Sequence, residues 1–239
     1  MPVYPDKDAI GCSKKLRDEK LAPFPRTEYS VKVNRQEYYA IITHMDAQLG
    51  RILDALDKTG KADNTYIFFT ADHGLAVGHH GLIGKQSMYD HSMRVPMMVC
   101  GPSLPKNKKL GMPVYLQDIM PSTLELAGVK KPGYVQFKSL MPLISGKKKS
   151  SYDAVYGAYK ADLQRMVAVG NYKLIMYPAI RKIKLFNLKD DPMEMNNLAS
   201  VKKYEPVIAR LFKTFGKLQK ETGDTLKIDI SEYSAKGIK

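Results

Sequence analysis

A carboxylate, an imidazole and a glycine follow one short apolar segment of the 239-residue sequence. Residues 66–70 are aromatic, β-branched and apolar, which predicts a central, buried strand. Asp72, His73 and Gly74 come next. The carboxyl end of a parallel strand is where α/β sheets bind ligands, so chemistry is expected here. A simple turn is the other interpretation, with Asp72 capping a helix and Gly74 supplying a positive φ.

A glycine-punctuated loop follows this tripeptide and carries more side chains that could act on a ligand. Glycine recurs every three or four residues from position 74 to position 84. The same stretch brings His79, His80 and Lys85. Such an irregular segment is typical of a site loop rather than of a simple connection.

A second apolar run, residues 95–100, is bounded by Pro96 near its start and by Gly101-Pro102 at its end. It predicts another buried strand with a proline at its beginning. Cys100, at the end of this run, is expected to be a small core residue. The only other cysteine is Cys12, and two cysteines cannot form a disulfide framework.

The clearest helix predicted by the sequence spans residues 35–58. Apolar residues recur through it at helical spacing, Asn34 with Glu37 resembles a capping box, and Gly60 ends the pattern. The apolar stripe of this amphipathic helix is expected to pack on the sheet that holds residues 66–70.

The remaining elements divide the chain near residue 150. Residues 115–127 are predicted to form a helix, and residues 201–219 have helical period. Four short runs between turn residues predict an antiparallel sheet: 154–159, 165–169, 172–176 and 184–188. We therefore expect an irregular lead-in over 1–33, an α/β portion over 34–150 and a small α+β subdomain over 151–239.

The charge balance is unusual, with a formal net charge of +14 and a pI near 9.5. An excess of lysine favours polyanionic partners, although runs such as 147–149 are also typical of solvated loops. The sequence has no RNA-recognition aromatic signature, zinc knuckle or basic groove-reading helix, so nucleic acid is not expected. It also contains no apolar stretch that predicts a membrane span or a signal peptide.

Several segments together carry a family resemblance. In order they are YYAIITHMDAQLGRILDAL, ADNTYIFFTADHG, GHHGLIGKQSMYDHSMRVPMMVCGP, DIMPSTLELAG and LFNLKDDPMEMNNLA. This order and spacing resembles the C-terminal part of a type I, formylglycine-dependent sulfatase of the alkaline-phosphatase superfamily. The resemblance implies an α/β fold, forming part of a sulfatase-like sandwich with helices on a central sheet, followed by the small C-terminal α+β subdomain with its antiparallel four-stranded sheet and helix.

The resemblance also implies roles for four residues. Asp72 and His73 stand where the family places two ligands of a divalent cation, usually Ca²⁺, and Lys85 stands at the lysine that contacts sulfate oxygens. His80 matches the histidine of the family's G-x-H-G run, and it is either a catalytic pocket residue or a residue that structures the loop. Because Ca²⁺ prefers oxygen ligands, the imidazole of His73 leaves Mn²⁺ or Zn²⁺ open as alternatives.

The nucleophile of the resembled family is missing from this sequence. Such sulfatases make formylglycine from Cys or Ser in a C/S-x-P-x-R motif, whereas Cys12 to Arg17 lacks the proline and the spacing. The resemblance therefore implies a C-terminal portion of a sulfatase acting on a sulfated carbohydrate or small molecule, inactive alone, with the formylglycine expected in a preceding part. A periplasmic or secreted location is implied by the family.

Three alternatives stay open. A phosphodiesterase or phosphonate monoester hydrolase of the same superfamily would use an Asp-His metal pair readily. A non-catalytic module could bind polyanions through its lysines. A fragment without its own function would self-associate through an exposed sheet edge or apolar face.

Overall fold

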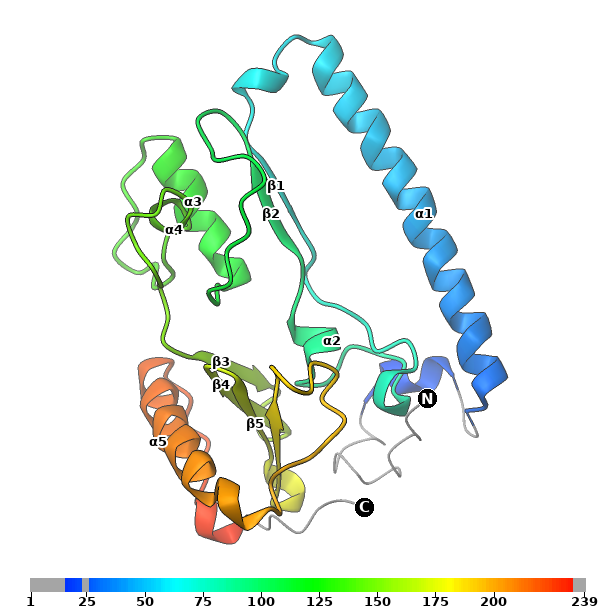
Figure 1. Ribbon diagram of the computed structural model, residues 1–239, viewed down its shortest axis with the longest axis vertical. Helices are drawn as coiled ribbons and strands as arrows, with labels where there is room; N and C mark the ends of the chain where they lie inside the picture. The colour runs from blue at the N-terminus through cyan, green and yellow to red at the C-terminus, as the bar shows by residue number, and fades with distance from the viewer. Residues whose placement is uncertain (1–15, 23–25, 234–239) are drawn as a thin grey trace. The chain divides into compact units, whose positions relative to one another are not determined.

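A computed structural model describes residues 16–22 and 26–233 of the chain (Figure 1). Contacts group them into two compact units. The long-helix unit comprises residues 32–72 and 95–152, and the C-terminal unit comprises residues 73–94 and 153–239 with the chain up to residue 31, as far as these are described. These units interleave along the sequence, so they do not test the domain ranges 34–150 and 151–239, which stay a prediction.

Helix α1, Glu28–Lys58, dominates the long-helix unit (Figure 1). The helix predicted over 35–58 is confirmed at its carboxyl end, but it begins at Glu28, inside the predicted lead-in. The other elements of this unit are β1 (Ile67–Thr70), β2 (Met97–Cys100), α3 (Ile119–Leu126) and α4 (Met141–Ile144), with short 3-10 turns at Ala62–Asn64 and Leu116–Asp118. The helix predicted over 115–127 is thus confirmed as α3 together with the 3-10 turn before it.

Two expectations for this unit are wrong in the described chain. β1 was expected to be a central, buried and parallel strand. Among the described strands it pairs only with β2, in antiparallel register with Ile67 opposite Cys100, and its residues are half-buried. Cys100 is exposed, because β2 alternates between half-buried and exposed positions and buries no side chain fully. A two-stranded ribbon has too little surface to bury its own apolar residues.

The apolar stripe of α1 does not pack on β1 and β2 as expected. Ile41 and Ile52 are 66% and 64% exposed, and among the described residues of α1 only Val31 is buried. Other large apolar side chains on this helix are exposed too, at Tyr39, Met45 and Leu53. The helical period in the sequence was correct, but the surface that would cover the stripe is not provided by the described part of the chain.

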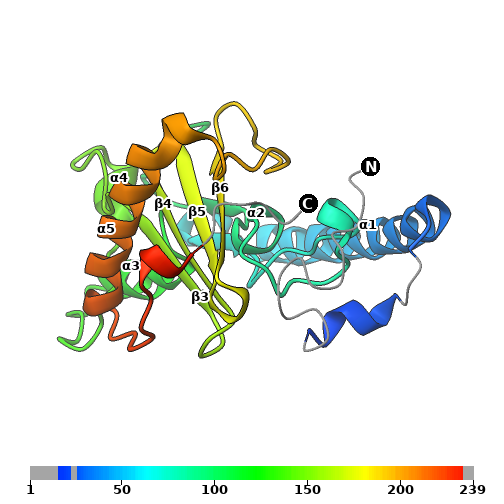
Figure 2. The same ribbon diagram turned by 90° about the horizontal axis from the view of Figure 1, so that it is seen from below.

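The C-terminal unit contains the predicted antiparallel sheet of four strands in the order β3-β4-β5-β6 (Figure 2). The strands are β3 (Val155–Tyr159), β4 (Gln164–Val169), β5 (Tyr172–Tyr177) and β6 (Lys182–Asn187). Helix α5, Glu205–Glu221, packs on one face of this sheet, and its residues Leu211 and Phe215 are buried against Leu174. The α/β fold with a small antiparallel sheet and a C-terminal helix is therefore observed.

The other face of the same sheet carries the loop singled out from the sequence. Alternating side chains on a strand face opposite sides, so Ile175 and Tyr177 point away from α5 and pack with Ala76 and Leu82. Short helices complete the unit at Asp18–Leu21, His79–Gly81, Asp90–Met93 (α2), Pro178–Ile180, Lys202–Tyr204 and Ile230–Glu232. No described helix is both long and apolar enough to cross a membrane. Cys12 lies outside the described residues.

Candidate active site

His73 and Lys85 lie side by side although twelve residues separate them in the sequence. The Lys85 Nζ atom is 2.5 Å from His73 Nε2. An ammonium group can only donate, so Nε2 accepts and the ring proton resides on Nδ1, which faces the carbonyl oxygen of Gly74 at 3.1 Å. The Nε2 lone pair of His73 therefore points toward a positively charged group.

A hairpin-like loop brings Lys85 back to His73. The backbone N–H groups of Ala76, Val77 and Gly78 donate to Gly84, Ile83 and Leu82 in turn, at 2.9, 3.2 and 2.7 Å. The tip is a 3-10 turn in which Gly78 and His80 take left-handed backbone angles, φ 97° and 54°. The ladder of hydrogen bonds fixes which residues face each other, so it sets the position of Lys85.

Gly74 is required by close packing, and the simple-turn interpretation does not explain it. Its φ is not among the positive values of the chain, so no left-handed angle is needed there. Instead, a Cβ atom at this position would lie 2.0 Å from the carbonyl oxygen of His91, and the Gly74 N–H donates to the carbonyl of Ser92. The absence of a side chain lets α2 approach the chain directly after His73.

A buried ion pair from the N-terminal segment holds the returning strand of the loop. The Glu19 carboxylate accepts hydrogen bonds from the backbone N–H groups of Ile83 and Gly84, at 3.2 and 3.0 Å. Arg26 Nη1 donates to Glu19 at 2.6 Å and to the Gly81 carbonyl at 2.9 Å. Both side chains are almost fully buried, at 2% and 6% exposure for Arg26 and Glu19. This pair is not visible in the sequence, because nothing in an irregular segment indicates loop contacts more than fifty residues away.

His80 is a buried residue of the loop tip. Its ring stacks on Tyr89 with centroids 3.8 Å apart, and Nε2 lies 3.1 Å from the Glu194 carbonyl oxygen. Burial lowers the pKa of His80 to about 4, so the imidazole is neutral at physiological pH. These contacts show how His80 packs, while its catalytic role stays a prediction.

Glu194 ties the loop to the sheet through a second buried ion pair. Lys173 on β5, 1% exposed, places its Nζ 2.7 Å from carboxylate oxygens of both Glu194 and Asp90. The other oxygen of Glu194 accepts the Asp90 N–H at the start of α2. Burial raises the pKa of Glu194 while the Lys173 ammonium opposes that shift. Glu194 has a left-handed φ of 56°, and its role was also not visible in the sequence.

The structure assembles part of the predicted site. His73 and Lys85 are together in the C-terminal unit, whereas Asp72 is the last residue of its segment of the long-helix unit. Within residues 16–22 and 26–233, no three His, Cys, Asp or Glu side chains are placed to hold a metal ion. Asp72 and His73 supply a carboxylate and an imidazole, which are ligand types for a divalent cation, but Nε2 of His73 is engaged by Lys85 here. The ligand roles of Asp72 and His73 therefore stay predictions.

Two family models match the chain. The model described as Sulfatase matches residues 4–129, and the model described as N-sulphoglucosamine sulphohydrolase, C-terminal, matches residues 78–221. Each of them covers more than half of the 239 residues. Between them they include every residue of the candidate site.

Known proteins with similar sequences and structures include sulfatases, as the two family models do. The choline-sulfatase of Rhizobium meliloti is 33% identical over 182 residues, covering 74% of this chain and 35% of the relative. A structure in complex with its substrate D-glucosamine-2-N,6-O-disulfate has a TM-score of 0.77 at 26% identity, over 89% of this chain and 46% of that one. The phosphonate monoester hydrolase of Agrobacterium radiobacter has a TM-score of 0.72 at 25% identity, over 82% and 43%. The chain spans less than half the length of these proteins.

The Glu19–Arg26 pair generates a stability prediction. Arg26→Met leaves the Glu19 carboxylate buried without its cation, which we expect to lower the free energy of unfolding by roughly 3–5 kcal/mol. Urea unfolding followed by far-UV circular dichroism measures this. The matched control is Arg17→Met, because the Arg17 side chain is 77% exposed and its ion pair with Asp18 should contribute less than about 1 kcal/mol. Equal unfolding midpoints for the two variants would contradict the role of the pair.

The buried imidazole of His80 generates a pH prediction. Its folded pKa of about 4 lies below the unfolded value of about 6.5. The unfolded chain therefore binds more protons in this window, so stability from this group is complete above pH 6.5 and is lost as pH falls toward 4, by roughly 3 kcal/mol in total. His80→Gln should flatten the dependence of the unfolding free energy on pH between 4 and 6.5, whereas His44→Gln, at an exposed position of α1, should not. An NMR titration midpoint for His80 near 6.5 would overturn this assignment.

Proposed function

Because the chain belongs to the sulfatase family, we propose that the polypeptide in which it works hydrolyses sulfate esters. Lys85 contacts the sulfate oxygens, and Asp72 with His73 provides two ligands of a divalent cation. The observation that supports this most directly is the pairing of Lys85 Nζ with His73 Nε2 at 2.5 Å. It holds the Lys85 ammonium group beside His73, and a fixed positive charge stabilises negative charge that develops on a sulfuryl group.

The residues of this chain would bind and orient. The hairpin loop and the Glu19–Arg26 pair hold the Lys85 backbone, which lets its ammonium group act without reorganisation. With its proton on Nδ1, His73 would offer Nε2 to a cation once the Lys85 ammonium group, which Nε2 now accepts from, turns to a sulfate oxygen. A bound cation would supply Lewis-acid stabilisation of the oxygens it touches. We propose Ca²⁺, with Mn²⁺ or Zn²⁺ as alternatives because of the imidazole.

We propose a sulfated carbohydrate as the substrate. Support comes from the strongly basic chain and from the similar structure solved with a disulfated glucosamine. The choline-sulfatase relative supports a small sulfate ester instead, and it defines the competing substrate for the assay. A periplasmic or secreted location is part of the same proposal and rests on the family.

The chain by itself is proposed to be inactive. No cysteine or serine in the 239 residues stands in a C/S-x-P-x-R motif. His73 and Lys85 can position charge, but an attacking group for sulfur is not among them. Turnover therefore requires a polypeptide that also supplies the nucleophile and further metal ligands.

A phosphonate monoester hydrolase or phosphodiesterase is the second candidate. The Agrobacterium radiobacter structure supports it with a TM-score of 0.72 at 25% identity. An Asp-His pair and a lysine suit a phosphoryl oxygen as well as a sulfuryl oxygen, since both groups carry negative charge. The two functions differ in the substrate turned over rather than in these residues.

Site substitutions test the function in a polypeptide that includes the nucleophile segment. We expect Lys85→Ala to lower kcat for 4-nitrophenyl sulfate by roughly 10²–10³-fold, because one charge-stabilising donor is lost. Asp72→Asn should lower the bound metal measured by atomic emission. Lys58→Ala, at an exposed position of α1, is the control and should leave both values unchanged. Clear turnover of a phosphodiester or phosphonate ester without sulfatase turnover would favour the second candidate.

The isolated 239-residue chain should show no turnover of any of these esters and should self-associate. Apolar side chains such as Ile41 and Ile52 are exposed on α1, and contact between apolar surface and water is unfavourable. Sedimentation should give a mass above that of the 26.9 kDa monomer. The double variant Ile41→Lys, Ile52→Lys should shift the distribution toward monomer, while a monomeric unmodified chain would contradict the expectation.

A further inference from the structure

Two lysine runs that are far apart in the sequence meet in the long-helix unit. Lys108 lies in the loop after β2, and its Nζ donates to the carbonyl oxygen of Ile144 at 3.1 Å. The same Nζ lies 4.0 Å from where a Cβ atom on Gly146 would be. The loop 106–109 is therefore held against the start of the run 147–149, and all the lysines of both runs are exposed.

The charge of this region is strongly one-sided. Residues 95–152 contain nine lysines and only two acidic residues, Asp118 and Glu125. Asp118 is fully buried, and its carboxylate is occupied by the Tyr152 hydroxyl and by the backbone N–H groups of Tyr115 and Lys138. Asp118 therefore joins residues 115, 138 and 152 to one another and forms no ion pair with a surface lysine among the described contacts.

Not every lysine of the region is available to a ligand. Lys131 Nζ donates to the carbonyl oxygens of Val135 and Phe137, and Lys138 Nζ donates to that of Ser151. These two lysines brace the segment. The remaining positive charge is carried by Lys130 and by the exposed runs 106–109 and 147–149. Lys108 in the first run also donates to a backbone carbonyl, that of Ile144, so Lys106, Lys109 and the run 147–149 offer the most to a partner.

A shallow cleft borders the run 147–149 and the start of the loop that leads to the run 106–109. It has a volume of about 370 Å³, and Ser103 and Leu104 from one side and Ser145 and Lys147 from the other help to line it. Tyr66 also lines it, with a ring held by a hydrogen bond from its hydroxyl to the Pro102 carbonyl oxygen and by close packing against Gly101. A cleft lined by an aromatic ring and by Lys147 suits a sugar ring that bears an anionic substituent.

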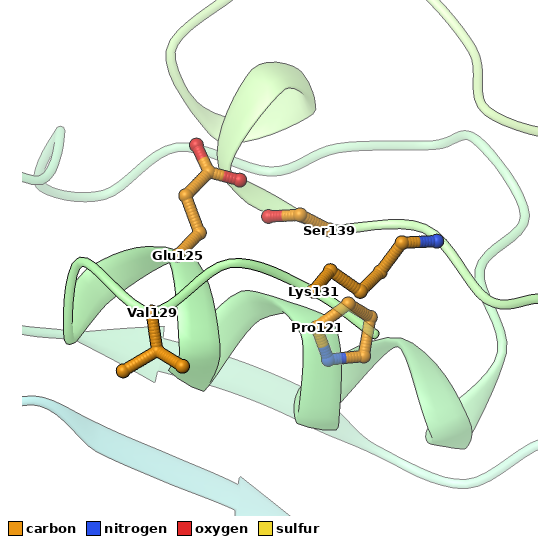
Figure 3. Close-up of a pocket in the computed structure, with 5 residues that line it drawn as sticks. All are labelled: Pro121, Glu125, Val129, Lys131 and Ser139. Carbon is orange, nitrogen blue, oxygen red and sulfur yellow. The ribbon is translucent and has the colours of Figure 1, made fainter. Parts of the chain in front are cut away.

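The neighbouring cleft is less suited to an anion. It has a volume of about 280 Å³ and is lined by Pro121, Glu125, Val129, Lys131 and Ser139 (Figure 3). Figure 3 shows the Lys131 amine pointing away from the Glu125 carboxylate. Glu125 also lines the 370 Å³ cleft, so a polyanion is expected to bind there through Lys147 and away from Glu125.

We propose that Tyr66, the loop 101–109 and the segment 141–149 form an accessory surface that binds a sulfated polysaccharide chain. It goes beyond the proposed hydrolysis, because binding here needs neither a metal ion nor a nucleophile. The choice of a sulfated glycan among polyanions rests on the proposed function. The surface would hold a polymeric ligand through lysines that lie on a different unit from Lys85.

Binding of a size-defined heparin oligosaccharide to the 239-residue chain, measured by calorimetry over a salt series, tests the proposal. The variant Lys147→Gln, Lys148→Gln, Lys149→Gln should bind about tenfold or more weakly at 50 mM NaCl and show a shallower dependence of log affinity on log salt. The control Lys213→Gln, Lys217→Gln, Lys220→Gln removes the same charge from exposed positions of α5 and should change affinity less than about threefold.

Two further arms make every outcome informative. Lys106→Gln, Lys108→Gln, Lys109→Gln removes the other run and should weaken binding similarly, so an unstable first variant leaves the test intact. Equal losses for the α5 control and the two runs would overturn the surface, since binding would then follow net charge alone. Single-stranded DNA of matched charge that binds as tightly as heparin would overturn the choice of a sulfated glycan. Because no turnover is measured, these results are independent of whether the hydrolase proposal holds.

Discussion

The burial of two ion pairs that hold the site loop is the constraint on which the candidate site depends. Glu19 with Arg26 and Glu194 with Lys173 each place charged groups where water is largely excluded. Charges in such surroundings are tolerated only when every partner is present. The geometry of the loop therefore depends on Glu19 and Glu194, which come from opposite ends of the described chain. The position of Lys85 next to His73 depends on the same contacts.

The two faces of the four-stranded sheet are covered in different ways. Apolar packing against α5 stabilises one face through residues such as Leu174 and Phe215. The opposite face pairs apolar contacts, as between Ile175 and Ala76, with the buried charges at the edges of the loop. A sheet that is covered on both sides is rigid, and rigidity is what a charge-positioning lysine requires. The small C-terminal sheet thus serves as the platform for the site loop as well as a core of its own.

The sequence predicted what depends on local pattern and missed what depends on distant partners. The four strands of the C-terminal sheet and the helix α5 follow from alternation and helical period, which neighbouring residues determine. The roles of Glu19 and Glu194 could not be predicted, because the loop groups that they contact, Ile83 and His80, lie 64 and 114 residues away and no local period records them. The burial of Cys100 and of the α1 stripe was predicted wrongly for a related reason. Periodicity shows which face of an element is apolar, but whether another surface covers that face is a tertiary fact.

The lysines show why net charge alone is a weak guide to function. At physiological ionic strength the screening length is about 8 Å, so exposed charges act together only when they are neighbours. Lys173 is neutralised inside a buried pair, and Lys138 is occupied by a backbone carbonyl. The excess of +14 therefore does not act as one field. What matters to a polyanion is the meeting of Lys108 with the segment that precedes Lys147, because the fold has turned two separate runs into one local concentration of charge.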